Sequence, residues 1–292
     1  MILQSLLAVV TAYLTGMLYY GIYRNITARF HKRIGPPVTQ NIYDSFKLLF
    51  KKESTSYGWI FYMGPIVMAT ASILTLLFIP LFNDGEMEGV SRYGDLFVVL
   101  YLMAMGPLGN ALAVGISANP FGAMGIGRGL TRMAGLELPF YLSLMALVYF
   151  SGSSDITQIM SAQEDMPNMM RYPLLFTASM ISLTGFLGKS PFDVVGAPVE
   201  VYSGPASEFG GKFLGLLMSQ SAIFTFAKLL LMVDLFWGGA GSLAELLLKS
   251  FILFIITVFI GIVYGRFKVH QAVDFLIKIP SAIAVAGILL HL

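Results

Sequence analysis

The connector from Gly188 to Lys212, GKSPFDVVGAPVEVYSGPASEFGGK, carries three carboxylates between two strongly apolar segments: Asp193, Glu200 and Glu208. Prolines interrupt the connector, so the two glutamates cannot share one regular helix. Burial raises the pKa of a carboxyl group toward neutrality, and a nearby cation lowers it. Three carboxylates in one broken connector, flanked by a lysine at each end, are unusual in so apolar a chain and mark the connector as a candidate functional segment.

Two further charges lie inside apolar segments, where an ionisable side chain is costly and marks a functional site. Glu137 follows Arg132 by about one and a half turns, so an ion pair with Arg132 is the alternative to a functional role. Lys228 lies near the middle of its segment, and its candidate partners are Glu137 and a loop carboxylate. For Lys228 a structural ion pair and a role in a proton relay are both open.

The composition places these charges in a membrane. The chain is 57% hydrophobic and only 12% charged, whereas a soluble domain carries about twice that charged fraction. We therefore expect an all-α, polytopic membrane protein whose residues 1–292 form a single transmembrane domain. About eight apolar segments predict its spans: Ile2–Tyr23, Trp59–Phe82, Asp95–Ser117, Met124–Phe150, Tyr172–Leu187, Phe213–Phe236, Leu243–Gly265 and Val273–Leu290.

The charges in the connectors alternate from one side to the other. One side holds basic residues: Arg24, Arg29, Lys32, Arg33, Lys47, Lys51, Lys52, Arg128, Arg132, Lys189, Lys212, Arg266 and Lys268. The other side holds acidic ones, with Arg92 and Arg171 against them: Asp84, Glu86, Glu88, Asp155, Glu164 and Asp165. The positive-inside rule predicts a cell-membrane protein with the basic connectors in the cytoplasm and both termini outside.

Charged residues near the predicted span ends favour an interfacial role: Asp95, Asp234, Glu245, Lys249, Asp274 and Lys278. Asp95 begins an otherwise apolar segment and is also a candidate for a proton path.

Several classes of site are excluded or disfavoured. The chain has no cysteine, which excludes Cys-ligated iron–sulfur clusters within it, and His31, His270 and His291 lack paired spacing for a metal. The stretch GAMGIGRG (122–129) lacks a preceding strand and a P-loop lysine, so helix packing explains its glycines better. We expect no cofactor or metal in this chain and no nucleic-acid partner.

The basic connector 24–58 contains a turn, RIGPP, and then NIYDSFKLLF. The spacing of its apolar residues predicts an amphipathic helix lying on the cytoplasmic membrane surface: Ile42, Tyr43, Phe46, Leu49 and Phe50. Such a helix is either an anchor in the lipid interface or a docking platform for a cytoplasmic partner.

Three blocks resemble the complex I subunit 1 family, which comprises membrane subunits of bacterial NADH:quinone oxidoreductases. The first connector matches its R-x-G-P, Q and D-x-x-K-L-x-x-x-K-E pattern through Arg33, Gly35, Pro36, Gln40, Asp44, Lys47, Leu48, Lys52 and Glu53. ANPFGAMGIGRGLTRMAGLELPF resembles the segment that ends in a membrane glutamate, here Glu137. SPFDVVGAPVEVYSG resembles the A-P-F-D-x-x-E-A-E loop and matches it at Pro191, Phe192 and Asp193; Glu200 and Glu208 are approximate counterparts.

The departures from this family are informative. The first turn is shortened to GPPVTQ and the E-A-E cluster is replaced, which weakens the case for quinone binding. A shortened loop is similar to the branch found in group 4 membrane-bound hydrogenases, formate hydrogenlyase and archaeal sulfane reductase complexes.

The resemblance implies a membrane-anchoring and ion-pumping subunit that couples redox chemistry in a peripheral arm to H⁺ or Na⁺ translocation. It implies hydrogenase-like large and small peripheral subunits that carry the iron–sulfur clusters, and antiporter-like membrane subunits, as partners. The implied proton path uses Glu137, Asp193, Glu200, Glu208, Lys228 and Asp95. The implied docking residues for the peripheral arm are Arg33, Gln40, Asp44 and Lys47.

Other functions remain open from sequence. The chain could be the quinone-chamber subunit of a complex I-type enzyme, a standalone ion transporter, or a structural anchor for a peripheral enzyme. The absence of visible repeats disfavours the transporter. A purely structural anchor leaves Glu137 and Lys228 at membrane depth without a reason.

Overall fold

The structure is a computed structural model that describes residues 2–52, 57–82, 95–117 and 119–292. Five of the charged residues named above lie outside the described residues: Glu53, Asp84, Glu86, Glu88 and Arg92. Over the described ranges the chain is helical and contains no β-strand. The helices are α1 (Ile2–Phe30), α2 (Gln40–Leu49), α3 (Gly58–Phe78), α4 (Leu96–Val114), α5 (Pro120–Ser151), α6 (Ile156–Ser161), α7 (Asn168–Arg171), α8 (Pro173–Phe186), α9 (Pro198–Val201), the 3₁₀ helix η2 (Gly204–Glu208), α10 (Gly211–Trp237), α11 (Leu243–Val263) and α12 (Val269–Leu289).

Seven of the described helices are long and apolar enough to cross a membrane, and α8 is a shorter apolar helix. This confirms the expected all-α fold with about eight helices. With 14 residues, α8 is about 21 Å long, shorter than the roughly 30 Å hydrocarbon core. α1 continues seven residues beyond its predicted end at Tyr23, so Arg24 and Arg29 lie on the helix.

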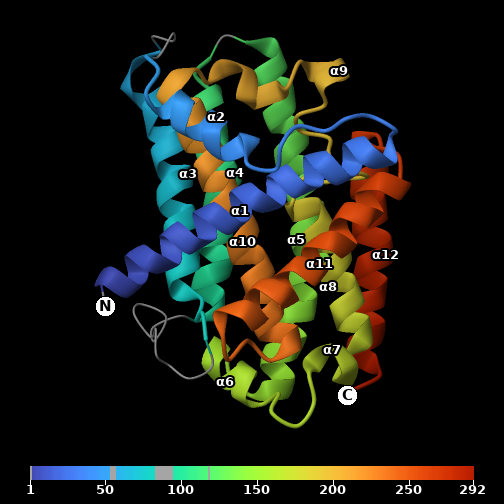
Figure 1. Cartoon of the computed structure of the whole chain (residues 1–292). Helices are drawn as coiled ribbons and strands as arrows, with labels where there is room; N and C mark the ends of the chain where they lie inside the picture. Colours follow the sequence, from blue (N-terminus) through green and yellow to red (C-terminus); the bar gives the residue numbers. More distant parts are fainter. Residues whose placement is uncertain (1, 53–56, 83–94, 118) are drawn as a thin grey trace.

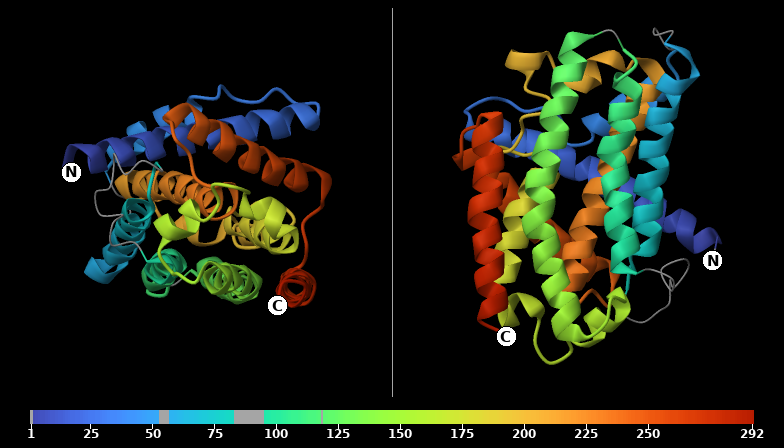
Figure 2. Two further views of the ribbon diagram at one scale, coloured as in Figure 1. Left: turned by 90° about the horizontal axis from the view of Figure 1, so that it is seen from below. Right: turned by 180° about the vertical axis from the view of Figure 1, so that it is seen from behind.

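The helices are arranged in three layers (Figure 2). α10 and α8 lie in the middle, α1 and α11 cover one side, and α4, α5 and α12 cover the other. α10 is the most buried of the long helices, and it contacts α1, α2, α3 and α11. α1 crosses it obliquely (Figure 1). The crossing requires Gly16, because a Cβ there would collide with the backbone of Ala222.

The two ends of the bundle differ in what they carry (Figure 1). We call one the loop end: it holds α2, α9, η2 and residues 188–210. We call the other the far end: it holds α6, α7 and the C-terminus. The predicted separation of Glu200 and Glu208 is confirmed, because α9 and η2 are distinct helices joined by Tyr202 and Ser203 in the left-handed region (φ 54° and 72°).

Candidate functional site

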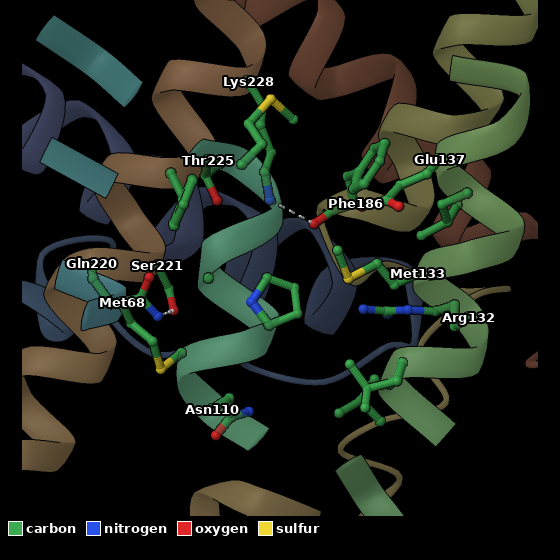
Figure 3. A pocket seen from close by; sticks show the side chains of 18 of the residues that line it. Met68, Asn110, Arg132, Met133, Glu137, Phe186, Gln220, Ser221, Thr225 and Lys228 are labelled. Atoms are coloured by element: carbon green, nitrogen blue, oxygen red, sulfur yellow. Dashed lines mark hydrogen bonds between the residues drawn. The ribbon is translucent and has the colours of Figure 1, made fainter. Parts of the chain in front are cut away.

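A cavity of about 200 Å³ lies among α3, α4, α5, α8 and α10. We call it the central cavity (Figure 3). Its wall is mixed, and its polar and charged members are Tyr20, Asn110, Arg132, Glu137, Gln220, Ser221, Thr225 and Lys228. The structure therefore brings two of the predicted proton-path residues, Glu137 and Lys228, to one cavity from different helices.

Lys228 meets the end of the short helix α8. Its Nζ donates to the carbonyl oxygen of Phe186 at 3.3 Å (Figure 3). It lies 5.0 Å from the ring centroid of Phe224 and 5.6 Å from that of Phe186. The last carbonyls of a helix have no intrahelical partner and attract cations. Of the two alternatives left open for Lys228, the structure does not show the ion pair: none of the ion pairs in the described residues involves Lys228.

Glu137 and Arg132 face the central cavity from α5 without forming an ion pair in the described part of the chain. The hydrogen-bonding neighbour of Glu137 is Tyr141, one turn further along α5. Arg132 donates from Nη1 to the carbonyl oxygen of Phe192 at 3.1 Å. Phe192 belongs to the connector between α8 and α9, so Arg132 links that connector to the cavity wall.

Each carboxylate of the loop end bonds to a different element. Asp193 accepts from Arg266 Nη2 at 3.1 Å, and Arg266 lies in the connector between α11 and α12. Glu200 accepts from Nη1 of Arg128, on α5, at 2.5 Å, and its side chain is 54% exposed. These two carboxylates are held by arginines of separate segments, and they do not form one cluster.

Glu208, at the end of η2, is nearly buried. Asn119 Nδ2 donates to its carboxylate at 2.5 Å. The Tyr57 hydroxyl also hydrogen-bonds to Glu208, and this bond, with the carboxylate charge, raises the pKa of Tyr57. η2 packs closely on α5, since a Cβ on Gly125 would lie 2.6 Å from Cδ of Pro205. Gly122 and Gly125 thus serve helix packing, as expected from the sequence, whereas a Cβ on Gly127 would meet nothing within 4 Å.

The amphipathic helix predicted in the first connector is confirmed as α2, and its orientation is informative. Its buried face is polar: Asn41 accepts from Arg24 Nη1 at 2.7 Å, and Ser45 Oγ lies 3.0 Å from Ser219 Oγ on α10. Its aromatic residues point outward, with Phe50 88% exposed. The bundle therefore leaves the apolar face of α2 uncovered.

Of the four predicted docking residues, Gln40, Asp44 and Lys47 lie on α2, and Arg33 follows the end of α1, where its N–H bonds to the carbonyl oxygen of Ala28. Arg33 and Lys47 are exposed. Gln40 donates from Nε2 to Asp44 Oδ1 at 2.8 Å, one turn along the helix. The two cations are thus available to a partner, while the amide and carboxylate pair with each other.

Asp95 lies at the far end and begins α4. Its side chain accepts from the backbone N–H of Phe97 at 3.2 Å, which makes it an N-cap. Asp155 caps α6 in the same way. Asp95 is therefore distant from the central cavity, and its local geometry is that of a helix cap.

The interfacial placement of Asp234 is wrong. Its side chain is fully buried near the end of α10, and neither carboxylate oxygen has a hydrogen-bond partner among the described residues. The connector between α5 and α8 folds over this helix end: Gln163 and Asn168 donate to the carbonyls of Asp234 and Leu235 at 2.8 and 2.9 Å. The spacing of residues along α10 could not predict that the connector between α5 and α8 covers Asp234.

A second cavity, of about 290 Å³, lies at the loop end between α1, α2, η2 and α10. Its wall is mostly apolar: Met17, Tyr20, Arg24, Asn41, Ala206, Leu214, Leu217, Met218 and Ser221. We call it the interfacial pocket.

Over the described ranges, no group of three or more His, Cys, Asp or Glu side chains is placed to hold a metal ion.

Comparisons with known proteins agree with one another. The family model described as NADH dehydrogenase matches residues 3–292. Formate hydrogenlyase subunit 4 of Escherichia coli K12 is 27% identical, covering 89% of this chain and 87% of its own. A subunit of the NADH-quinone oxidoreductase of Geobacillus kaustophilus is 26% identical, covering 98% of this chain and 90% of its own.

A solved structure is also similar along the whole chain. It is a chain of the membrane-bound sulfane sulfur reductase, described as an archaeal respiratory membrane complex. The two chains are 37% identical with a TM-score of 0.93, over 99% of this chain and 98% of the other. The resemblance drawn from the three sequence blocks is thereby confirmed.

Proposed function

Because the chain belongs to the NADH dehydrogenase family of membrane subunits, we propose that it couples redox chemistry to ion translocation in a respiratory membrane complex. The complex is of the hydrogenase or sulfane reductase type. It lies in the cell membrane with the loop end in the cytoplasm and both termini outside. The ion is H⁺ or Na⁺. Support comes from the full-length similarity and from the charged central cavity.

One contact carries the proposal: Arg132 reaches from the central cavity to the carbonyl oxygen of Phe192, next to Asp193. A displacement of the connector between α8 and α9 therefore moves a guanidinium in a cavity that contains Glu137. A cation that approaches a carboxylate favours its charged form, and a cation that withdraws favours protonation. Redox events beside the connector can thus load or release a proton on Glu137.

Lys228 has a different task in this scheme. Its bond to Phe186 ties α10 to the end of α8, where the connector begins. Asp193 and Glu200 are the loop-end carboxylates of the proposed path, and each is paired with an arginine from another segment. Glu208 is the inner carboxylate of this group. Asp95 is left out of the path, because its geometry is that of a cap.

The peripheral arm docks on the loop end. Hydrogenase-like large and small subunits, which hold the iron–sulfur clusters, cover the outward face of α2, where Lys47 is exposed beside exposed aromatic rings, and reach Arg33 after the end of α1. Antiporter-like subunits continue the ion path within the membrane. The chain itself holds no redox centre in this proposal and performs no redox chemistry alone.

The test replaces Glu137 by Gln in the full complex, held in sealed inverted membrane vesicles and driven by its own electron donor. Ion uptake per electron should fall by about tenfold or more, because an amide cannot carry the proton, while assembly and electron transfer persist. Glu164→Gln, an exposed residue of the far end, is the matched control and should pump normally. Normal pumping by the Glu137 variant would refute the proposal.

A second function is favoured by one observation, the interfacial pocket, whose mostly apolar wall suits the tail of a quinone. In that case the chain is the quinone-chamber subunit of a complex I-type enzyme. Ala206→Trp places a large side chain at the exposed edge of this pocket. It should raise the KM for quinone in a quinone-linked enzyme and leave a hydrogenase-type or sulfane reductase-type complex unaffected.

A further inference from the structure

Lys189 occupies an unusual place for a charged residue of the loop end. It follows α8 by three residues and is only 3% exposed. Its Nζ lies 3.3 Å from the ring centroid of Tyr23, 4.9 Å from that of Tyr20 and 6.0 Å from that of Phe254. The ammonium group is therefore enclosed by three aromatic rings from α1 and α11.

Two opposing effects act on this amine. Ring faces attract the ammonium form, whereas burial disfavours any charged form. Burial dominates and lowers the pKa of Lys189 to about 7, while the negative charge of Asp193 acts in the opposite direction. Both the ammonium and the neutral amine are thus populated near neutral pH.

The position of Lys189 connects the loop end to the central cavity. Asp193, four residues further on, is paired with Arg266 at the exposed surface. On the inner side, Tyr20 contributes to both the ring enclosure and the cavity wall, and its hydroxyl lies 3.0 Å from that of Thr225. Thr225 faces the central cavity from α10 (Figure 3).

We propose that Lys189 is a proton-carrying residue of the translocation path, which takes protons at the loop end and delivers them to the central cavity. The inference rests on the proposed function. In the delivery step an N–H bond of the ammonium breaks, and an O–H bond forms on the carboxylate of Glu137 through the hydroxyls of Tyr20 and Thr225. A proton from the Asp193 side then restores the ammonium.

Other titratable and charged groups surround this amine. α1 presents Tyr20 and Tyr23, the connector before α12 presents Arg266, and α5 presents Arg132, which is bonded to Phe192. α11 presents only the ring of Phe254. The arginines stay protonated at any physiological pH, so Lys189 is the cation of this group that can exchange a proton.

The decisive variant is Lys189→Arg, studied in the full complex in sealed inverted vesicles. Arginine keeps the positive charge and stacks on aromatic rings, but it does not release a proton. Proton uptake per electron should fall by about 100-fold, the lower range for losing a positioned proton-transfer group. Lys212→Arg, an exposed lysine at the start of α10, is the matched control and should pump normally.

The results with the two variants distinguish a failure of the Lys189 inference from a failure of the proposed function. Normal pumping by Lys189→Arg, with pumping lost in Glu137→Gln, overturns the role of Lys189 and leaves the proposed function intact. Normal pumping by both variants overturns the proposed function and this inference with it.

A second variant serves if Lys189→Arg does not assemble. Tyr23→Leu removes the nearest ring, which disfavours the ammonium form. The pH above which pumping declines should then move down by about half a unit. An unchanged pH midpoint would overturn the inference.

Discussion

The loop end and the far end use their carboxylates in opposite ways. At the loop end, Asp193 and Glu200 bond to arginines from other segments of the chain. At the far end, Asp95 and Asp155 cap the helices that they begin. Long-range bonds transmit the displacement of one segment to another, whereas a cap fixes its own helix. In the proposed function, the loop end is therefore the part that transmits movement, and the far end serves as a rigid base.

The largest effect is expected where η2 lies against α5. Gly125→Ala places a methyl group 2.6 Å from Cδ of Pro205, so η2 must shift. Overpacking of this kind costs about 1–3 kcal/mol. The complex should unfold at a lower temperature, and proteases should cut residues 188–210 faster.

Gly127→Ala is the matched control for this substitution, because nothing lies within 4 Å of its added Cβ. It should leave the free energy of unfolding unchanged or raise it by up to about 1 kcal/mol, since alanine favours a helix. Equal effects of the two variants would contradict the tight packing of the loop end.

Asp234 is the exception at the far end, because it is buried and neither carboxylate oxygen has a described partner. An unsatisfied buried polar group costs about 1–3 kcal/mol. Asp234→Leu should therefore raise the unfolding temperature while pumping continues. A stabilised complex that no longer pumps would show that the far end takes part in translocation. The contrast between the loop end and the far end would then be wrong.

A smaller effect separates the two possible roles of Asp95. Asp95→Ala removes the cap of α4 and should lower the free energy of unfolding by about 1 kcal/mol. Asp95→Asn removes the charge but can still cap, so this variant should be as stable as the wild type and pump normally. Loss of pumping in Asp95→Asn would return this residue to the proton path.

The smallest effect is a shift in pH dependence. The charge of Asp193 raises the pKa of Lys189, so Asp193→Asn should lower that pKa further below its value of about 7. The ammonium form then persists only to a lower pH. Because Asp193 also lies in the proposed path, this variant should pump less, and the pumping that remains, measured from pH 5.5 to 8.5 and normalised to its maximum, should decline at a lower pH than in the wild type. A shift to higher pH would contradict the sign of this interaction.

Much of the fold could be predicted from the sequence, because spans in lipid must be helices and the apolar segments are long. The spacing of apolar residues in the first connector also predicted that a helix forms there and how long it is. The pattern did not give the outward orientation of its apolar face, since that depends on Asn41 and Ser45 packing against α1 and α10.

The site was harder to predict than the fold. Glu137 and Lys228 were found because charges in apolar segments are costly, but their partners come from elements distant in sequence. Lys228 meets the carbonyl of Phe186, and Asp234 is covered by the connector between α5 and α8. Tertiary contacts of this kind leave no local signature. The burial of Lys189 could not be predicted from its neighbours in the sequence, because the three rings that enclose it lie on two other helices.

The most direct test of the central claim is the number of ions moved per electron when the link between loop and cavity is cut. Arg132→Gln removes the guanidinium that reaches Phe192. Lys278→Gln is the matched control, because it alters only the exposed pair with Asp274 on α12. We expect electron transfer to continue in both variants, the ratio to fall about tenfold or more in Arg132→Gln, and the ratio to stay near the wild-type value in Lys278→Gln. Equal ratios in the wild type and Arg132→Gln would contradict the proposed function.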